Sequence, residues 1–452
     1  MDIKRNSLTE GSIWMSMLLF VLPVFLGNLF QQLYNAFDAW CVGYFINDDA
    51  LAAVSSSGSL IFMMVSFFQG LSMGAGVIIA RYFGAKQYTS MRKAIHTSIA
   101  FGLVIGVVLT ILGVALTPII LGWMGTPNEV LPRSISYFRY YFLGAIFVVM
   151  YNIFVGILHA VGDSKHPLYY LIVSTFVNIG LDLLFVGVFG RDVGSAAVAT
   201  TISQGISALL CFIHLLRIEG PYKVSIREVC FDKKSLLDII KYGLPSGVQN
   251  SVIAFANVVV QSNINSFGKA AMAGCGSYSK LEGFVFLPVT CFSQALATFV
   301  GQNLGAGNHE RVKKGIGFGI VCSCLIAEFV GLISYLFAPE LISIFCDTHA
   351  SIDFGVRHMQ TICLFYFLLA FSHCVASILR GAGKSTVPMF VMLACWCVIR
   401  VTYITIAVKL VNQLTTVSWA YPISWSLSSI IFLIYLLKAD WIHNFDTETQ
   451  KA

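Results

Sequence analysis

The chain has 452 residues, of which 57% are hydrophobic and 11% are charged, and its mean hydropathy is +0.80. This composition excludes a soluble enzyme and is typical of a protein that crosses a membrane many times. The formal net charge of +6 does not indicate a nucleic-acid partner, because Lys and Arg gather in alternate loops, which is a signal of membrane topology.

Apolar segments recur along the whole chain, and about 20 such residues suffice to cross a bilayer as a helix. We therefore predict an all-α polytopic membrane protein with twelve transmembrane helices. Because the basic loops lie on the side of the N-terminus, we expect a plasma-membrane (inner-membrane) protein with both termini in the cytoplasm. The predicted spans are 13–45, 51–81, 94–121, 136–160, 167–190, 195–216, 243–267, 271–302, 315–337, 358–380, 388–410 and 417–437.

The first predicted span carries a carboxylate, Asp38, within otherwise apolar sequence. An ionisable side chain in hydrocarbon is costly and marks a functional site by default. Gln31 and Asn35 precede Asp38 by about two turns and one turn, and so share parts of its helix face. The alternative is that Asp38 lies close to the outer surface and is hydrated there. Earlier in the same span, Pro23 removes a backbone hydrogen bond and makes this helix a candidate hinge.

The fifth and sixth spans carry polar residues that match Asp38 in depth. Asn178 and Asp182 are four residues apart and share a helix face, and Thr200 follows near the start of the sixth span. Counted from the expected ends of the spans at about 1.5 Å per residue, Asp38, Asp182 and Thr200 all lie on the order of 10 Å below the outer surface. We expect these side chains to meet.

Two carboxylates in a partly dry pocket disfavour joint ionisation, so such a pair can hold a proton. The same oxygens, with those of Asn178 and Thr200, can instead supply the hard ligands that Na⁺ prefers. Either ion would neutralise the pair, and the sequence does not choose between H⁺ and Na⁺. The alternative is a structural role in which Asp182 accepts hydrogen bonds from backbone or hydroxyl groups.

The two halves of the chain repeat each other at an offset of 221 or 222 residues. Matching segments begin at Leu22 and Leu244, at Gly84 and Gly305, and at Ile157 and Ile378. We therefore predict duplicated six-helix lobes in the same orientation: an N-lobe over 1–216, a cytoplasmic connection over 217–242 and a C-lobe over 243–452.

The C-lobe does not repeat the carboxylate pair, because Asp38 corresponds to Val260 and Asp182 to Tyr403. Its deep charged groups are different ones. Glu282 can pair with Arg400 across helices or line a substrate path, and these alternatives stay open, as do the roles of Lys280 and Glu328.

The order and spacing of these motifs resemble the multidrug and toxic compound extrusion (MATE) family, in its bacterial form. The match covers nearly the whole chain, including Pro23, the run from Gln32 to Gly43, the Gly162-Asp163…Pro167 turn and Gln302-Asn303-Leu304-Gly305-Ala306. The resemblance implies secondary active export of organic cations, drugs or other amphipathic compounds by antiport with H⁺ or Na⁺. By position it implies an N-lobe cation site at Asp38, Asn178, Asp182 and Thr200, with Gln31, Asn35, Asn152 and Glu282 as candidates for lining the substrate path.

The alternative function is a flippase for a lipid-linked intermediate of the same wider superfamily, which would show several basic residues in a central cavity. No metal cluster or nucleophile motif indicates an enzyme. We expect a small-molecule substrate, the lipid bilayer as the only other partner, no cofactor besides the coupling ion, and a monomer.

Overall fold

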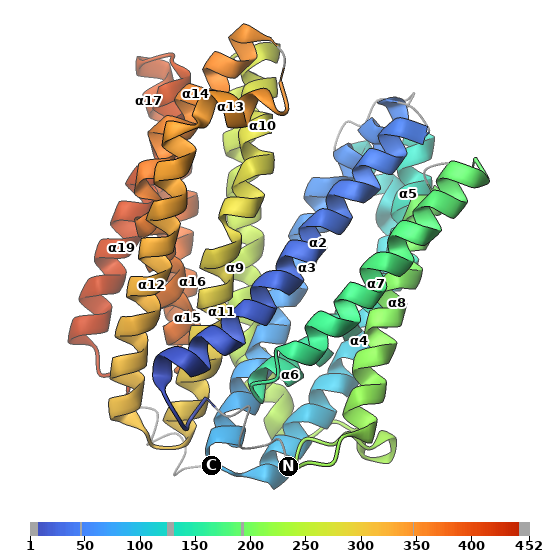
Figure 1. Cartoon of the computed structure of the whole chain (residues 1–452), viewed down its shortest axis with the longest axis vertical. Helices are drawn as coiled ribbons and strands as arrows, with labels where there is room; N and C mark the ends of the chain where they lie inside the picture. The colour runs from blue at the N-terminus through green and yellow to red at the C-terminus, as the bar shows by residue number, and fades with distance from the viewer. Residues whose placement is uncertain (1–7, 46–47, 124–130, 191–193, 347, 443–452) are drawn as a thin grey trace. The chain divides into compact units, whose positions relative to one another are not determined.

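The computed structural model describes residues 8–45, 48–123, 131–190, 194–346 and 348–442, and within these ranges the regular structure is entirely helical (Figure 1). The first half contains α2 (Ile13–Phe45), α3 (Asp48–Gly84), α4 (Tyr88–Trp123), α5 (Leu131–Leu143), α6 (Ala145–Ala160), α7 (Lys165–Asp182), the π-helix η1 (Leu183–Val188) and α8 (Gly194–Arg217).

A 3₁₀ turn, η2 (Ile226–Glu228), lies in the connection to the second half. The second half contains α9 (Lys233–Asn265), α10 (Lys269–Val285), α11 (Leu287–Gly305), α12 (His309–Leu336), α13 (Ala338–Ser343), α14 (His349–Ile362), η3 (Cys363–Phe365), α15 (Tyr366–Gly381), α16 (Thr386–Met392), the π-helix η4 (Leu393–Ile399), α17 (Arg400–Leu410), α18 (Leu414–Ser418) and α19 (Ala420–Lys438).

The helices coincide with the predicted spans. In the described part of the chain, nine helices are long and apolar enough to cross a membrane, and α5 with α6 forms a further span that is bent by 44°. The remaining two predicted positions, 51–81 and 243–267, are covered by α3 and α9. The prediction of an all-α polytopic membrane protein is confirmed.

The chain divides into two compact units that do not follow its order strictly. The first unit contains Leu22–Gly247, whereas the second contains Leu8–Val21 and the chain from Val248 onward. The first turns of α2 therefore belong to the second unit, and the first turns of α9 belong to the first unit. The lobe boundaries expected from the repeat stay a prediction.

The core of the first unit lies among α3, α4, α6 and α8, with α7 packed along α8. Residues Ile79 of α3, Ile157 of α6 and Ile239 of α9 belong to one buried apolar cluster. Glycines bring α3 very close to α9, because a Cβ on Gly70 would overlap the backbone of Gly247, and one on Gly74 would overlap that of Gly243. Such glycine contacts are the usual way for membrane helices to approach closely.

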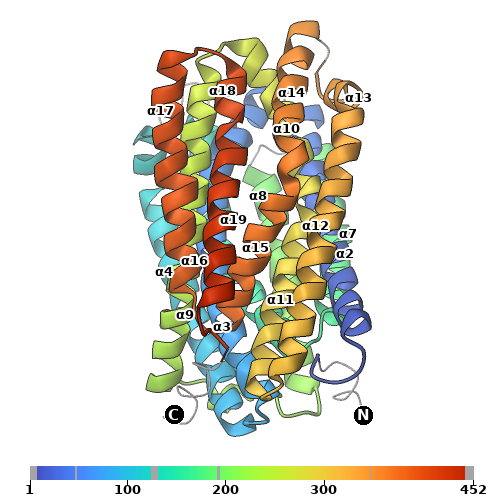
Figure 2. The ribbon, with the colours of Figure 1, turned by 90° about the vertical axis from the view of Figure 1, so that its left-hand side faces the viewer.

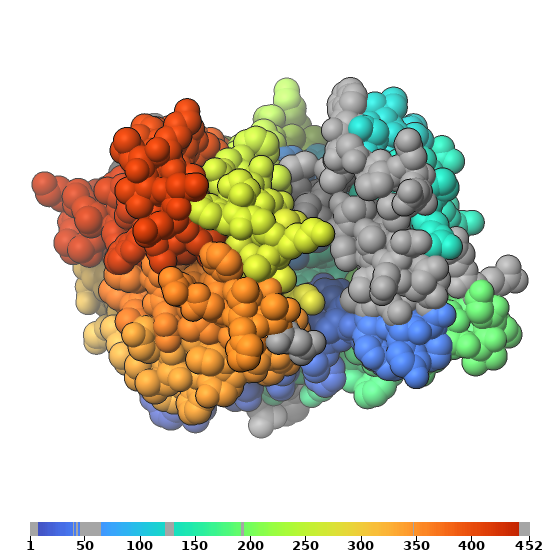
Figure 3. Space-filling view, turned by 90° about the horizontal axis from the view of Figure 1, so that it is seen from above, coloured from blue at the N-terminus to red at the C-terminus, as the bar shows by residue number. Residues whose placement is uncertain are grey.

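The second unit is built around α11, α12 and α15, with α10 packed on α14 and α19 packed on α15 (Figure 2). The view from above shows the upper end of this unit, where α13 and α14 (orange) and α17 and α18 (red) lie at the surface (Figure 3). The segment before α2 is held at the other end of this unit. There the guanidinium of Arg311 donates to the backbone carbonyls of Leu8, Glu10 and Gly11 at 2.7–3.2 Å.

The connection between the halves is fastened to the first unit in a similar way. Arg92 pairs with Glu228 at 2.9 Å, and the Thr97 hydroxyl donates to the Cys230 carbonyl at 3.3 Å. Asp232 accepts hydrogen bonds from the backbone and hydroxyl of Ser235 at 3.0 and 2.9 Å, which holds the pKa of this partly exposed carboxyl below its usual value. It thereby caps the N-terminus of α9.

We expect Gly74→Leu to destabilise the first unit, because the new side chain would overlap the backbone of Gly243. Overpacking of this kind costs about 1–3 kcal/mol. The measurement is the thermal unfolding midpoint of detergent-solubilised protein. Gly317→Leu is the control, because nothing lies within 4 Å of a Cβ at Gly317. Equal midpoints for the two variants would contradict close packing of α3 on α9.

Candidate functional site

The structure brings together the four polar residues whose depths agree in the sequence. The Thr200 hydroxyl donates to Oδ2 of Asp38 at 3.2 Å, and the side chains of Asn178 and Asp182 lie against the Asp38 carboxyl. Asn178 and Asp182 are fully buried. All four residues belong to the first unit. Their role in binding a cation stays a prediction.

Local helix geometry fixes the relative positions of these side chains. Asn178 and Asp182 face the same side of α7 because they are four residues apart. One turn before Asn178, the Ser174 hydroxyl donates to the Ser203 carbonyl of α8 at 2.7 Å, which ties α7 to α8 close to Thr200. The Thr200 hydroxyl also lies 3.0 Å from the Ala196 carbonyl of its own helix. Because the hydroxyl uses its hydrogen in these contacts, the lone pairs of the Thr200 oxygen remain available to coordinate a cation.

Most of the polar atoms at the centre of the site have no partner among the described residues. Oδ1 of Asp38, both carboxylate oxygens of Asp182 and both polar side-chain atoms of Asn178 are buried without a hydrogen bond. The two carboxylates can be joined by a hydrogen bond only when one of them carries a proton. Because unpaired buried charges are costly, the site as it stands favours the uptake of a positive charge.

Tyrosines surround the Asp38 carboxylate, and sequence reasoning missed them. Tyr34 lies one turn before Asp38 and close to Thr200, and Tyr137 and Tyr141 of α5 also lie within electrostatic range of Asp38. The rings of Tyr137 and Tyr141 are stacked with centroids 6.5 Å apart. The depth count does not find Tyr137, because this residue lies next to the outer end of the predicted span 136–160, whereas Asp38 lies deeper in the span 13–45.

A π-helical turn begins directly after Asp182 and was also not predicted. The segment Leu183–Val188 widens α7 at the level of the site. Such turns leave backbone groups imperfectly paired and occur frequently at functional sites. In the second unit, the π-helix η4 ends directly before the buried Arg400. Each unit thus has a widened helical turn next to a deep charged residue.

The structure does not join the other predicted N-lobe residues to this cluster. Among the described residues, no hydrogen bond or ion pair connects Gln31, Asn35 or Asn152 with Asp38. Asn35 is exposed, and the Asn152 amide donates to the Val148 carbonyl of its own helix at 2.8 Å. Their role in lining a substrate path stays a prediction.

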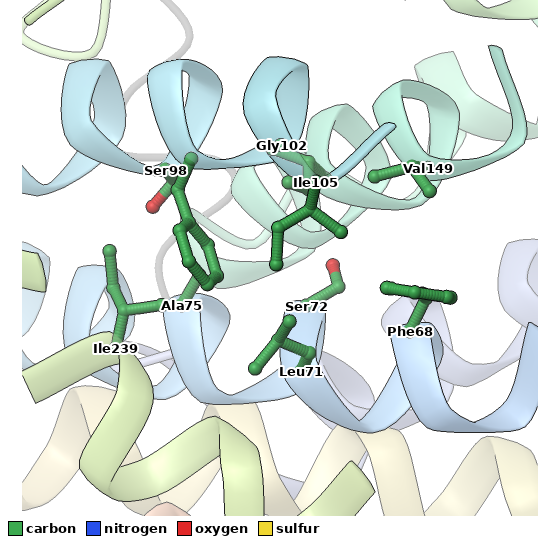
Figure 4. Close-up of a pocket in the computed structure, with 11 residues that line it drawn as sticks. Phe68, Leu71, Ser72, Ala75, Ser98, Gly102, Ile105, Val149 and Ile239 are labelled. Carbon is green, nitrogen blue, oxygen red and sulfur yellow. The ribbon is translucent and has the colours of Figure 1, made fainter. Parts of the chain in front are cut away.

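A small cavity in the first unit lies apart from the carboxylates (Figure 4). Its lining is almost wholly apolar and includes Phe68, Leu71, Ile105 and Val149. The Ser72 hydroxyl at its edge is already committed, because it donates to the Asn152 carbonyl at 2.8 Å. The cavity has no free polar group that could orient a ligand, so we regard it as a packing gap.

In the second unit, Glu282 and Arg400 form no direct ion pair in the described structure. Glu282 accepts a hydrogen bond from the Tyr278 hydroxyl at 3.2 Å, and that hydroxyl lies 3.1 Å from the hydroxyl of Tyr366. Lys280 does not pair with Glu282 either, since its ammonium lies 5.3 Å from the centre of the Phe345 ring. Glu282 therefore remains available to line a polar path.

Arg400 is held by groups that carry no charge. Its guanidinium donates to the Ser424 hydroxyl at 2.8 and 3.0 Å, and lies 5.2 and 4.7 Å from the ring centres of Trp396 and Tyr421. These cation–π contacts partly replace the lost hydration of the cation. Glu328 is placed differently, because it accepts a hydrogen bond from the Phe367 backbone at 3.3 Å on an exposed face.

A family model described as MatE matches the chain twice, over residues 23–184 and 245–406. The two matches begin at Pro23 and Pro245 and are offset by 222 residues, which confirms the duplication. A curated relative, "Probable multidrug resistance protein YoeA" of Bacillus subtilis, is 29% identical over 396 residues, which cover 86% of each chain.

Solved structures share the fold. One, described as the "outward-facing conformation of a multidrug resistance MATE family transporter", has a TM-score of 0.90 at 22% identity and covers 98% of each chain. Structures of a MATE described as being in the bent and in the straight conformation have TM-scores of 0.88 and 0.89 at 23% identity, each covering 97% of this chain and 98% of the other. These proteins are transporters, which points away from an enzyme. The two family matches together span most of the sequence, and the chain belongs to the MatE family of membrane transporters.

Proposed function

We propose that this protein exports organic cations, drugs or other amphipathic compounds by antiport with H⁺ or Na⁺, and that Asp38 and Asp182 form the coupling site. The observation that carries the proposal is the buried carboxylate pair, whose oxygens have no cationic partner among the described residues. The names of the multidrug relatives support the substrate class. Export requires such a site to take up either an ion or a cationic substrate, but not both at once.

The donor atoms suit either coupling ion. A single proton shared between Asp38 and Asp182 removes the repulsion between them. A Na⁺ ion would instead be held by hard oxygen atoms from the carboxylates, the Asn178 amide and the Thr200 hydroxyl. In both cases the charge that attracts a cationic substrate disappears, and the pocket can lose water.

Pro23 is the proposed hinge that converts ion binding into movement. It lies inside α2, fifteen residues before Asp38, and the division between the two compact units falls directly before Leu22. One helix thus carries both the bending element and a coupling carboxylate. The bent and straight forms of a related fold support this mechanism. The ion can bias α2 only by its differential affinity for the two shapes.

We further propose that both termini lie in the cytoplasm, because the basic loops lie on their side. Substrate then enters from the cytoplasm, and ion binding at the outward half of α2 promotes its release to the outside.

We expect Asp38→Asn to abolish export while the protein still folds and inserts, because the amide keeps the shape but removes the charge. The measurement is drug-stimulated H⁺ and Na⁺ flux in proteoliposomes. Asp182→Asn should have a similar effect, and the double variant should be scarcely worse, because residues that act as one unit are not additive. The control is Asp353→Asn, since Asp353 forms an exposed pair with Arg357. Full coupling in Asp38→Asn, or lipid translocation without ion dependence, would overturn the proposal.

We expect Asp182→Asn to raise the thermal stability of the empty protein at neutral pH, because one of two neighbouring buried charges is removed. The gain should correspond to about 1–3 kcal/mol. Lowering the pH or adding Na⁺ should then stabilise the unmodified protein more than the variant. Asp353→Asn should change the unfolding midpoint little, as expected for a surface pair. A lower midpoint for Asp182→Asn would indicate a structural role for this carboxylate.

We expect Pro23→Ala to slow turnover several-fold while leaving ion and substrate binding measurable, because it restores a backbone hydrogen bond at the hinge. Spin labels at exposed Tyr44 of α2 and exposed Leu112 of α4 would report the bend as a change in distance between high and low pH. The change should be lost in Pro23→Ala and kept in Pro118→Ala, which alters a proline inside α4. Identical distances under all conditions in the unmodified protein would exclude bending.

A further inference from the structure

A carboxylate and two imidazoles meet at the end of the first unit opposite the coupling site. Asp163 lies in the turn between α6 and α7, His166 lies in the first turn of α7, and His214 lies in the last turn of α8. One donor atom from each residue lies within 4.8 Å of the other two. The cluster plays no part in the mechanism proposed above.

The two oxygens of Asp163 have separate tasks. Oδ1 accepts a hydrogen bond from the His166 backbone at 3.2 Å and caps α7. Oδ2 lies 2.6 Å from Nδ1 of His166 and 3.7 Å from Nε2 of His214. Gly162, at φ +88°, makes the turn that directs the carboxylate to this position. Burial opposes ionisation of this carboxyl, but the imidazoles outweigh it and hold the pKa of Asp163 well below its usual value.

The two imidazoles lie against each other, which disfavours a positive charge on both at once. Their rings are stacked with centroids 4.0 Å apart, and two positive charges at that separation would repel. Nε2 of His214 is buried and, within the part of the chain that the structure describes, has no hydrogen-bond partner, since Oδ2 of Asp163 lies 3.7 Å away. A helix cap needs only one oxygen of Asp163, and a carboxylate–histidine hydrogen bond needs only His166. Neither the helix cap nor the Asp163–His166 hydrogen bond requires a second imidazole at the position of His214.

The repeat shows that the fold does not require this cluster. At the offset of 221 or 222 residues, Asp163 corresponds to Lys384 and His166 to Val387. The same turn forms in the second unit, where Gly383 has a φ of +75°. The donor set is therefore a property of the first unit alone.

We propose that Asp163, His166 and His214 bind a divalent transition-metal ion such as Zn²⁺ or Co²⁺. Two histidines and one carboxylate form a recurrent metal-binding set that leaves other positions for water. In a tetrahedral site, ligands bound at about 2.0–2.2 Å lie roughly 3.3–3.6 Å apart. The widest pair of donor atoms, now within 4.8 Å, therefore has to approach by roughly 1.2–1.5 Å. The ion would displace the proton between Asp163 and His166. The His166 side chain is 41% exposed, which provides an entry path.

The proposal can be tested on the tag-free, full-length protein in detergent, with Co²⁺ as the spectroscopic probe. A Cys230→Ser background removes an exposed thiol that would compete for metal. We expect about one Co²⁺ per chain, with visible absorption bands of a nitrogen–oxygen ligand set, displaced by Zn²⁺. His166→Gln and His214→Gln should each weaken binding about tenfold or more. His349→Gln is the matched control, because His349 is exposed and lies in the second unit.

Cu²⁺ provides a second measurement, since its electron paramagnetic resonance spectrum should show coupling to two imidazole nitrogens, and to one in each cluster variant. If His214→Gln fails to fold, His166→Gln still tests the site, because the His166 ring is partly exposed. Absence of saturable binding, or unchanged affinity in the folded cluster variants, would overturn the proposal. Loss of binding in His349→Gln would also overturn it.

Discussion

Two carboxylates lie beside each other, Asp182 fully buried and Asp38 partly buried, without a cation in reach among the described residues, and the first unit depends on this constraint. Neighbouring helices exclude water from Asp182, while Thr200 supplies a single hydroxyl to Asp38. Removing charge from water costs several kcal/mol per ion unless a partner compensates. The folded chain therefore favours binding of a positive charge near the C-terminal end of α2.

Much of this site follows from the sequence, because depth in a membrane can be counted. Helices rise by a fixed amount per residue, so residues at equal distances from the ends of their spans, such as Asp38 and Asp182, lie at equal depths. The count gives no information on rotation about the helix axis. It also depends on the span ends, and Tyr137 was missed because α5 begins at Leu131, before the predicted start of that span at residue 136. The structure likewise gives Asn152 a hydrogen bond within its own helix, which a count along the chain does not reveal.

The spans were predictable because hydropathy identifies segments that are apolar enough to cross a membrane. The breaks within the helices were not predictable from hydropathy. The bend between α5 and α6 and the π-turn after Asp182 depend on how side chains from distant helices fit together. Hydropathy does not predict the close approach of Gly74 to Gly243 either. A glycine in an apolar segment has the same hydropathy value whether it faces lipid or the backbone of another helix. The metal-ligand set was missed because His214 is some 50 residues from Asp163 in sequence.

Each compact unit is completed by the opening turns of a helix that belongs mainly to the other unit. Leu8–Val21 joins the second unit, and the segment that ends at Gly247 joins the first. A chain cut between α8 and α9 would therefore produce two fragments, each lacking a part that only the other carries.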